Sequence, residues 1–79
     1  MGADKKQFPG KNLQISVNGK REVFDETVAT LDDLLNYLQI DGMRVAVAVN
    51  EACVPKGLRS QQTLNDGDRV EILAPMVGG

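Results

Sequence analysis

The chemistry of this sequence is concentrated in its last four residues, Met76-Val77-Gly78-Gly79. Gly79 ends in a carboxylate, and two residues without a Cβ can enter narrow clefts that are closed to other residues. Four extended residues reach roughly 13 Å, at about 3.3 Å each, which is far enough to enter the active site of a partner. A diglycine ending also occurs by chance, so the elements that precede it must decide whether it is functional.

The residue types that are missing narrow the chemistry further. The chain has no histidine, which removes the commonest general base and the usual nitrogen ligand of metal ions. Its single cysteine, Cys53, excludes an internal disulfide and a metal site built on a cysteine pair. Because Cys53 lies in an apolar stretch with no histidine to activate it, we expect an inert packing or surface residue rather than a persulfide carrier. A domain of this size rarely encloses an active-site cavity, so we expect no catalysis by the chain alone and no bound metal or cofactor.

Length and composition describe one small globular domain. Of its 79 residues, 42% are hydrophobic and 25% are charged, which is ordinary for a folded protein with a single core. A formal charge of −2 argues against nucleic acid or an anionic membrane as a partner, because both select a basic face. No apolar run approaches the roughly 18 residues of a membrane span and no signal peptide is evident, so a cytoplasmic location is expected. We divide the chain into a flexible leader at 1–12, a folded domain at 13–75 and a flexible tail at 76–79.

A hairpin is predicted at the start of the domain. Leu13, Ile15 and Val17 alternate with polar residues, which is the period of a half-buried strand. Asn18-Gly19 follows, and this dipeptide favours a type I′ turn because both positions tolerate positive φ. The returning strand is predicted at 21–24.

A helix follows the hairpin. Thr30 can cap its free N–H groups, and Asp32 and Asp33 lie beside the positive end of the helix dipole. The helix should end near Gln39, with Asp41-Gly42 as its exit. Leucines at helical spacing form one apolar stripe that predicts core packing: Leu31, Leu34, Leu35 and Leu38.

The next segment predicts two strands and a connection. Residues 45–49 read Val-Ala-Val-Ala-Val, as expected of a central strand that is covered on both faces. A short strand at 52–54 should be halted by Pro55, and Leu58 is expected to anchor the polar connection after it. That connection ends in an Asp66-Gly67 turn.

The last strand, at 69–73, leads directly into the tail. Val70 and Ile72 should face inward, which leaves Leu73 exposed to solvent. A lone exposed leucine is common, but Leu73 stands next to further apolar residues that include Pro75. A docking patch at the root of the tail is therefore plausible.

In order, these elements give ββαββ, an α+β arrangement in which one helix packs across a mixed sheet. The known topology of that architecture, rather than any propensity, places the first and last strands in parallel at the centre of the sheet.

The same order of motifs resembles the ubiquitin-like sulfur-carrier proteins of the ThiS and MoaD type, which have the β-grasp fold. The resemblance covers residues 13–79. It rests on four stretches in this order: Val45 to Asn50, Val54-Pro55-Lys56, Asp66 to Ile72, and Gly78-Gly79. The tight first hairpin and the basic residue after Val-Pro are most similar to the thiamine branch, ThiS, whereas the molybdopterin branch, MoaD, usually has a longer first loop.

The resemblance implies a sulfur carrier for thiazole formation in thiamine biosynthesis, which is a cosubstrate rather than an enzyme and a monomer when free. A separate E1-like adenylyltransferase of the ThiF type would use ATP and magnesium to adenylate Gly79. A sulfur donor enzyme would convert the adenylate to a thiocarboxylate, and a thiazole synthase of the ThiG type would accept the sulfur. The implied contacts form two sets: Gly78, Val77 and Met76 for threading the tail, and Leu73, Pro75 and Cys53 for docking the domain.

The sequence leaves other functions open. Within the same chemistry, the chain could be the small subunit of molybdopterin synthase or the carrier of another sulfur pathway. Outside it, a β-grasp interaction module with an idle tail or a ubiquitin-like modifier joined to lysine would share these features. Co-purification with a large catalytic subunit would identify the first alternative, and sulfur loading of Gly79 would separate a carrier from an interaction module.

Overall fold

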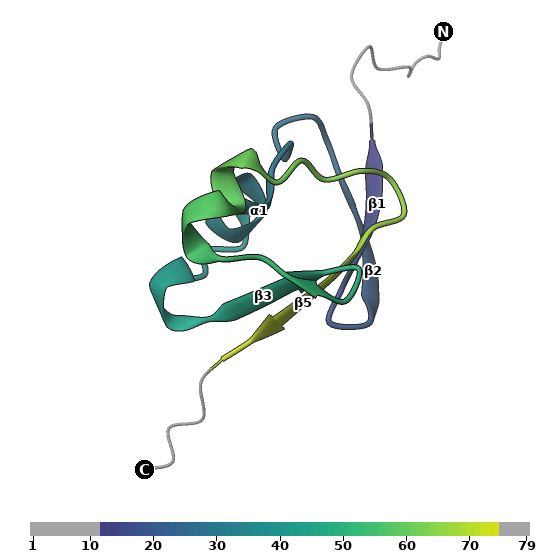
Figure 1. Cartoon of the computed structure of the whole chain (residues 1–79). Helices are drawn as coiled ribbons and strands as arrows, with labels where there is room; N and C mark the ends of the chain where they lie inside the picture. Colours follow the sequence, from purple (N-terminus) through teal and green to yellow (C-terminus); the bar gives the residue numbers. More distant parts are fainter. Residues whose placement is uncertain (1–11, 75–79) are drawn as a thin grey trace, which may run out of the picture.

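The structure is a computed structural model, and it describes residues 12–74 (Figure 1). Its elements, in chain order, are β1 (Leu13–Val17), β2 (Lys20–Phe24), α1 (Leu31–Tyr37), η2 (Gly42–Arg44), β3 (Ala46–Val49), β4 (Ala52–Cys53), η3 (Lys56–Gln61) and β5 (Arg69–Leu73), where η marks a 3₁₀ helix. The five strands form one mixed sheet in the order β2-β1-β5-β3-β4. As predicted, β1 and β5 pair in parallel near the centre of the sheet, and α1 lies across one face of it. The fold is α+β and of the β-grasp type.

Both hairpins of the sheet close through left-handed turn residues. Asn18 and Gly19 have φ values of 51° and 85°, which confirms the predicted type I′ turn between β1 and β2. Asn50 and Glu51, with φ values of 51° and 74°, join β3 to β4 in the same way. These primed turns match the right-handed twist of the strands, so two-residue connections suffice.

The N-terminus of α1 has a complete capping box. The Thr30 hydroxyl accepts from the Asp33 N–H at 3.1 Å, and the Asp33 carboxylate accepts from the Thr30 N–H at 3.0 Å and the Ala29 N–H at 3.1 Å. These bonds satisfy N–H groups that have no partner inside the helix. The predicted cap is confirmed.

The predicted end of this helix was two residues too long. The helix ends at Tyr37, and Gln39 takes a φ of 60°, a left-handed conformation that stops α-helices. Asp41-Gly42 is not the helix exit. It begins η2 instead, where the Asp41 carboxylate accepts from the Met43 N–H at 3.0 Å.

The capping box predicts a pH-dependent stability. The N–H groups of Ala29 and then Thr30 hold the pKa of Asp33 below its ordinary value of 3.8. A carboxyl whose pKa is lower in the folded than in the unfolded chain stabilises the fold above the unfolded pKa, and this contribution disappears as the pH falls through the folded pKa. Urea unfolding of Asp33→Asn should therefore show a deficit in stability that is constant above about pH 5 and shrinks toward about pH 2. A deficit of the same size at both ends of this range would contradict the assignment.

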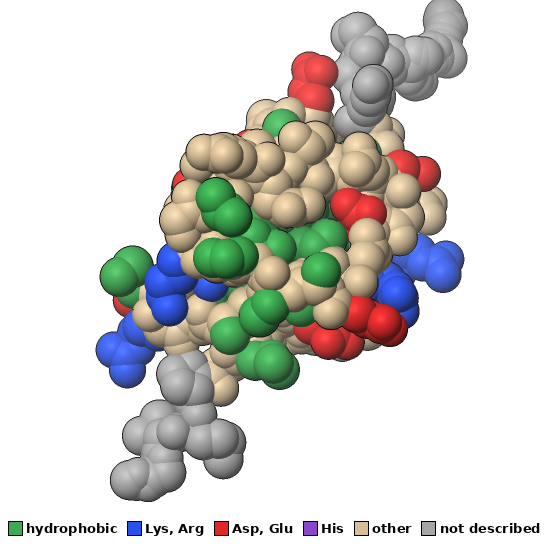
Figure 2. Space-filling model, viewed as in Figure 1, with side chains coloured by type: hydrophobic (Ala, Val, Ile, Leu, Met, Phe, Trp, Pro, Cys, Tyr) green, Lys and Arg blue, Asp and Glu red, His purple; other side chains and the backbone are tan. Residues whose placement is uncertain are grey.

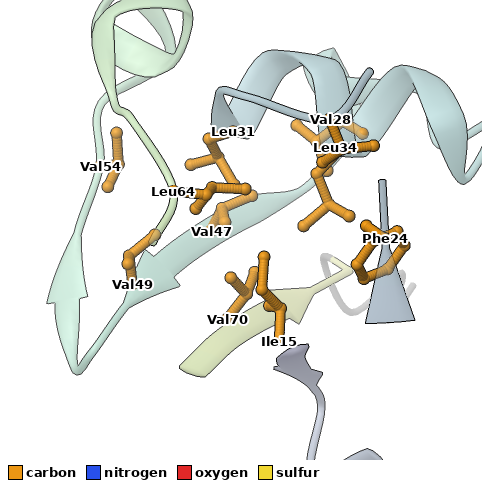
Figure 3. Packing of buried hydrophobic residues seen from close by; sticks show 11 residues of the cluster. Ile15, Phe24, Val28, Leu31, Leu34, Val47, Val49, Val54, Leu64 and Val70 are labelled. Atoms are coloured by element: carbon orange, nitrogen blue, oxygen red, sulfur yellow. The ribbon is translucent and has the colours of Figure 1, made fainter. Parts of the chain in front are cut away.

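The core lies between α1 and the sheet face that it covers (Figure 3). Side chains from the strands and from α1 point toward one another there, and the buried apolar set is Ile15, Phe24, Val28, Leu31, Leu34, Leu35, Val47, Val49, Val54, Leu64 and Val70. The prediction that β3 is covered on both faces was wrong. Val47 and Val49 enter the core, whereas Ala46 is exposed and Ala48 is half-buried on the other face, because the single helix covers one side only.

The predicted anchor of the connection after β4 was also wrong. Leu58 is 51% exposed, and Arg59 is the buried residue of η3, at 5% exposure. The guanidinium can be buried because two backbone carbonyls accept its hydrogen bonds: that of Gly42 at 2.6 Å and that of Val45 at 2.8 Å.

None of the helices among residues 12–74 has the length and apolar character that crossing a bilayer requires.

Candidate functional site

The strand β5 carries the chain from the middle of the sheet toward the predicted reactive end. Val70 is buried and Ile72 is half-buried on the core side, while Leu73 is 62% exposed on the opposite face, as the alternation predicted. The predicted reactive residue Gly79 lies outside the described residues, and so do the predicted threading and docking residues Gly78, Val77, Met76 and Pro75. Of the predicted site, the structure therefore places Leu73 and Cys53.

Two turn asparagines hold β5 in place. At its start, the Asn50 carboxamide oxygen accepts from the Arg69 N–H at 2.9 Å, and the Asn50 N–H donates to the Arg69 carbonyl at 2.7 Å. Near its end, the Asn18 carboxamide accepts from the Ile72 N–H at 2.7 Å and donates to the Ile72 carbonyl at 3.3 Å. The Asn18 N–H also donates to the Val70 carbonyl at 2.9 Å. The backbone that precedes Leu73 is thus hydrogen-bonded from both flanking hairpins.

This clamp predicts the effect of substitutions at Asn18. Asn18→Ala removes both carboxamide bonds and puts alanine, which disfavours the left-handed region more than asparagine does, at a φ of 51°, so the free energy of unfolding should fall by about 2 kcal/mol. Asn18→Gly removes the same bonds without the conformational penalty and should cost about 1 kcal/mol. Urea denaturation measures both values. If Asn18→Gly were as stable as the parent chain, the contribution of the carboxamide bonds would be refuted.

A shallow hollow of about 230 Å³ lies beside the end of β5. We call it the root hollow, and its lining residues are Met43, Arg44, Val45, Ala46, Lys56 and Leu73. They come from η2, the start of β3, the start of η3 and the end of β5. Figure 2 shows Lys and Arg side chains at the end of the molecule where β5 finishes, and hydrophobic side chains across the middle of the same view.

Arg59 ties together the two segments that form one wall of the root hollow. It donates hydrogen bonds to the carbonyls of Gly42 and Val45, the residues that directly precede Met43 and follow Arg44 in the chain. Arg59 is therefore a positioning residue for this wall. No role for Arg59 was predicted from the sequence.

Cys53 is exposed on β4, which agrees with the second of the two predicted settings, a packing or a surface residue. The cross-strand pairs Ala48–Cys53 and Ala46–Leu73 place Cys53 and Leu73 on the same open face of the sheet. Cys53 does not line the root hollow. Its predicted docking role stays a prediction.

Three residues of the root hollow were not predicted from the sequence to belong to the site: Met43, Arg44 and Lys56. Met43 is 75% exposed, an unusual setting for a large apolar side chain. In the sequence it stands in the segment between helix and strand that was interpreted as a simple exit, so nothing marked it as a surface residue beside Leu73.

Other hollows lie at the far end of β5. One of about 490 Å³ has Arg21, Asp68 and Arg69 among its polar lining, and one of about 750 Å³ is lined by segments near Leu13 and Leu64. Both are larger than the root hollow, but they flank the start of β5 rather than the end that leads to the predicted reactive residue. Within residues 12–74, no group of three or more acidic or cysteine side chains is arranged to hold a metal ion.

Comparison with known proteins identifies similar chains along nearly the whole sequence. The sequence model of the ThiS family matches residues 6–79. The uncharacterised protein ycf40 of Porphyra purpurea is 36% identical over 69 residues, which are 87% of this chain and 96% of that protein. A thiazole synthase of Paramagnetospirillum magneticum is 37% identical over 67 residues, which are 85% of this chain and only 20% of that enzyme.

Solved structures agree with this similarity. The crystal structure of the thiamine biosynthesis protein ThiS from Geobacter metallireducens superposes with a TM-score of 0.74 at 30% sequence identity, and the match covers 85% of this chain and all of that one. A solution NMR structure of a thiamine biosynthesis protein from the same organism gives a TM-score of 0.70 at 30% identity, with 85% and 88% of the two chains covered.

Proposed function

The chain belongs to the ThiS family, and we infer from this that it is a sulfur carrier protein of thiamine biosynthesis. The observation that carries the inference is the match of the family model along residues 6–79, together with the superposition of 85% of this chain on the whole of a ThiS structure. The similarity to part of a thiazole synthase points to the same pathway. ThiS-family sulfur carriers are small protein carriers, and we propose that this chain is consumed and recharged as a cosubstrate.

We propose that Gly79 is the residue that carries sulfur. A carboxylate is resonance-stabilised and a poor electrophile, so it needs activation before sulfur can replace one of its oxygens. A carboxylate oxygen of Gly79 would attack the α-phosphorus of ATP, bound with magnesium by a separate enzyme, and pyrophosphate would leave. Hydrosulfide from a donor would then attack the carbonyl carbon of the adenylate, the C–O bond to AMP would break, and a thiocarboxylate would remain after loss of the proton.

The remaining tail residues have proposed roles that follow from their shapes. Gly78 keeps the approach to the carbonyl carbon free of side chains. Met76 and Val77 give the tail apolar side chains with which a partner's channel can hold it. The β5 clamp by Asn18 and Asn50 supports this proposal, because a reactive end is delivered more accurately from a fixed strand than from a mobile one.

Three kinds of partner follow from this mechanism. An E1-like adenylyltransferase of the ThiF type would form the adenylate, a sulfur donor enzyme would supply the sulfur, and a thiazole synthase of the ThiG type would accept it. The similarity to a segment of a thiazole synthase supports the last of these. We further propose that the free chain is a monomer and works in the cytoplasm.

The test is an intact-mass measurement on the full chain. After incubation with its adenylyltransferase, Mg-ATP and a sulfide source, the mass should rise by the difference between a sulfur and an oxygen atom. Reactions without ATP serve as the control and should leave the mass unchanged. If the enzyme catalyses ATP–pyrophosphate exchange with the chain but the chain gains no sulfur from any sulfur donor, the carrier mechanism is wrong.

A further inference from the structure

The two central strands of the sheet do not end at the same level. The parallel pairing of β1 with β5 ends at Val17–Val70, whereas β5 continues to Leu73. The strand β1 stops there because Asn18, with a φ of 51°, begins the turn into β2. Among residues 12–74, the last three residues of β5 (71–73) are therefore paired with a strand on one side only, that of β3.

The side chain of Asn18 takes the place of the missing strand. Its carboxamide oxygen accepts from the Ile72 N–H at 2.7 Å, and its carboxamide nitrogen donates to the Ile72 carbonyl at 3.3 Å. A carboxamide offers an acceptor and a donor side by side, as a strand does, so it can continue the ladder of a sheet. The Asn18 N–H donates to the Val70 carbonyl at 2.9 Å, so the backbone and the side chain of one residue hold Val70 and Ile72 in succession.

The bonds of Asn18 determine how far the ordered strand extends toward Gly79. Without them, residues 71–73 and their β3 partners would form a two-stranded ribbon, and such ribbons are marginally stable in water. Loss of strand order back to Val70 would lengthen the segment between the sheet and Gly79 from residues 74–79 to residues 71–79. A longer tether lowers the effective concentration of the group at its end, and each added residue must be ordered again when a partner binds the tail.

We propose that Asn18 is a positioning residue for the reaction of Gly79. Its carboxamide fixes the point at which the chain leaves the sheet, and thereby the length of chain over which Gly79 is delivered to the adenylyltransferase. The inference rests on the proposed function, because it takes adenylation of Gly79 as the reaction. Asn18 acts through the backbone of Ile72, so this role requires no contact between Asn18 and the enzyme.

Asn50 provides a matched control at the other end of the same strand. It also has a φ of 51°, and its carboxamide accepts from the Arg69 N–H at 2.9 Å and donates to the Asp68 carboxylate at 2.9 Å. Asn50→Gly therefore removes two side-chain hydrogen bonds at a left-handed position without backbone strain, as Asn18→Gly does. Of the two asparagines that clamp β5, Asn18 holds the end that leads to Gly79 and Asn50 holds the start.

The test is ATP–pyrophosphate exchange by the cognate adenylyltransferase, with the full chain as the varied substrate, at a temperature where circular dichroism shows every variant folded. Asn18→Gly should reduce kcat/KM about fivefold, the factor that corresponds to its two lost hydrogen bonds. Asn18→Asp should lie between Asn18→Gly and the parent chain, because a carboxylate accepts from the Ile72 N–H but cannot donate to the Ile72 carbonyl. Asn50→Gly should stay within about twofold of the parent chain.

Amide hydrogen exchange locates the change within the strand. In Asn18→Gly the Ile72 amide should exchange faster while the Arg69 amide stays protected, and in Asn50→Gly the order should reverse.

The outcomes separate the positioning role from the function. An unchanged kcat/KM for Asn18→Gly would overturn the positioning role, and the carrier function would stand because the parent chain is still adenylated. Equal losses in Asn18→Gly and Asn50→Gly would also overturn it, since they would report a less stable sheet rather than the position of its end. If the parent chain itself supports no exchange, the proposed function is wrong and the positioning role falls with it.

Discussion

Deletion of Gly79 is expected to abolish sulfur loading while the fold and its stability stay unchanged. The reacting carbonyl carbon belongs to Gly79, so the truncated chain would place the carboxylate of Gly78 one residue short. A partner's active site tolerates little displacement, and a shift of about 1 Å can reduce a rate about 100-fold. A whole residue, about 3.3 Å, should therefore reduce adenylation below detection.

A series of variants separates the position of the terminal carboxylate from the absence of side chains beside it. Gly79→Ala keeps the carboxylate in place and adds one Cβ beside the reacting carbon, and Gly78→Ala adds a Cβ one residue earlier. Each should slow adenylation by about 100-fold, because a cleft shaped for an unbranched chain must displace the methyl group. One alanine appended after Gly79 moves the terminal carboxylate one residue farther along the chain, and this variant should be inactive like the deletion.

The measurements are ATP–pyrophosphate exchange, intact mass and thermal unfolding. Exchange reports adenylation, mass reports the sulfur gain, and unfolding shows that the domain is intact. Sulfur loading of the chain without Gly79 would refute the assigned residue. Normal loading of Gly79→Ala would show that the absence of side chains is unimportant.

Replacement of Arg59 is expected to have the largest effect on stability among single substitutions outside the apolar core. Arg59→Met keeps a long apolar side chain but leaves the carbonyls of Gly42 and Val45 without their donors. Hydrogen bonds from a charged donor contribute about 1.5–3 kcal/mol each. Part of their loss is offset because folding of the methionine variant no longer desolvates a guanidinium. The free energy of unfolding should therefore fall by about 2–3 kcal/mol.

Arg59→Lys should have a stability between that of the parent chain and that of Arg59→Met. An ammonium group can reach one of the two carbonyls but lacks the planar fork that holds both, so about half of the loss should remain. The Arg59 Nε has no hydrogen-bond partner in the part of the chain that the structure describes, which leaves the two terminal nitrogens as the effective donors. Arg69→Met is the matched control, because its exposed ion pair with Glu51, at 3.6 Å, should contribute less than about 0.5 kcal/mol.

Urea denaturation and amide hydrogen exchange test the Arg59 prediction together. In Arg59→Met the amide of Arg44, which donates to the Asp41 carbonyl at 3.0 Å, should exchange faster than the amides of β1. Equal stability of Arg59→Met and Arg69→Met would show that the buried guanidinium does not hold the wall of the root hollow.

Several parts of the fold could be predicted because short-range physics determines them. The Asn18-Gly19 turn follows from positive φ, the Thr30–Asp33 cap follows from free N–H groups, and the alternation in β5 follows from the pleat of a strand. The end of α1 could not be predicted in this way. Gln39 adopts a left-handed conformation although nothing in its side chain favours it, because the chain must turn there toward η2.

The sequence by itself determined the order of the elements, the outward orientation of Leu73 and the family resemblance that points to Gly79. Only the tertiary structure decided which residues surround Leu73. Met43, Arg44 and Lys56 are separated from it by 30, 29 and 17 positions, and sheet pairing and the hydrogen bonds of Arg59 bring their segments to the end of β5. The choice between Leu58 and Arg59 was decided in the same way, because a cation is buried only where two distant carbonyls converge to receive it.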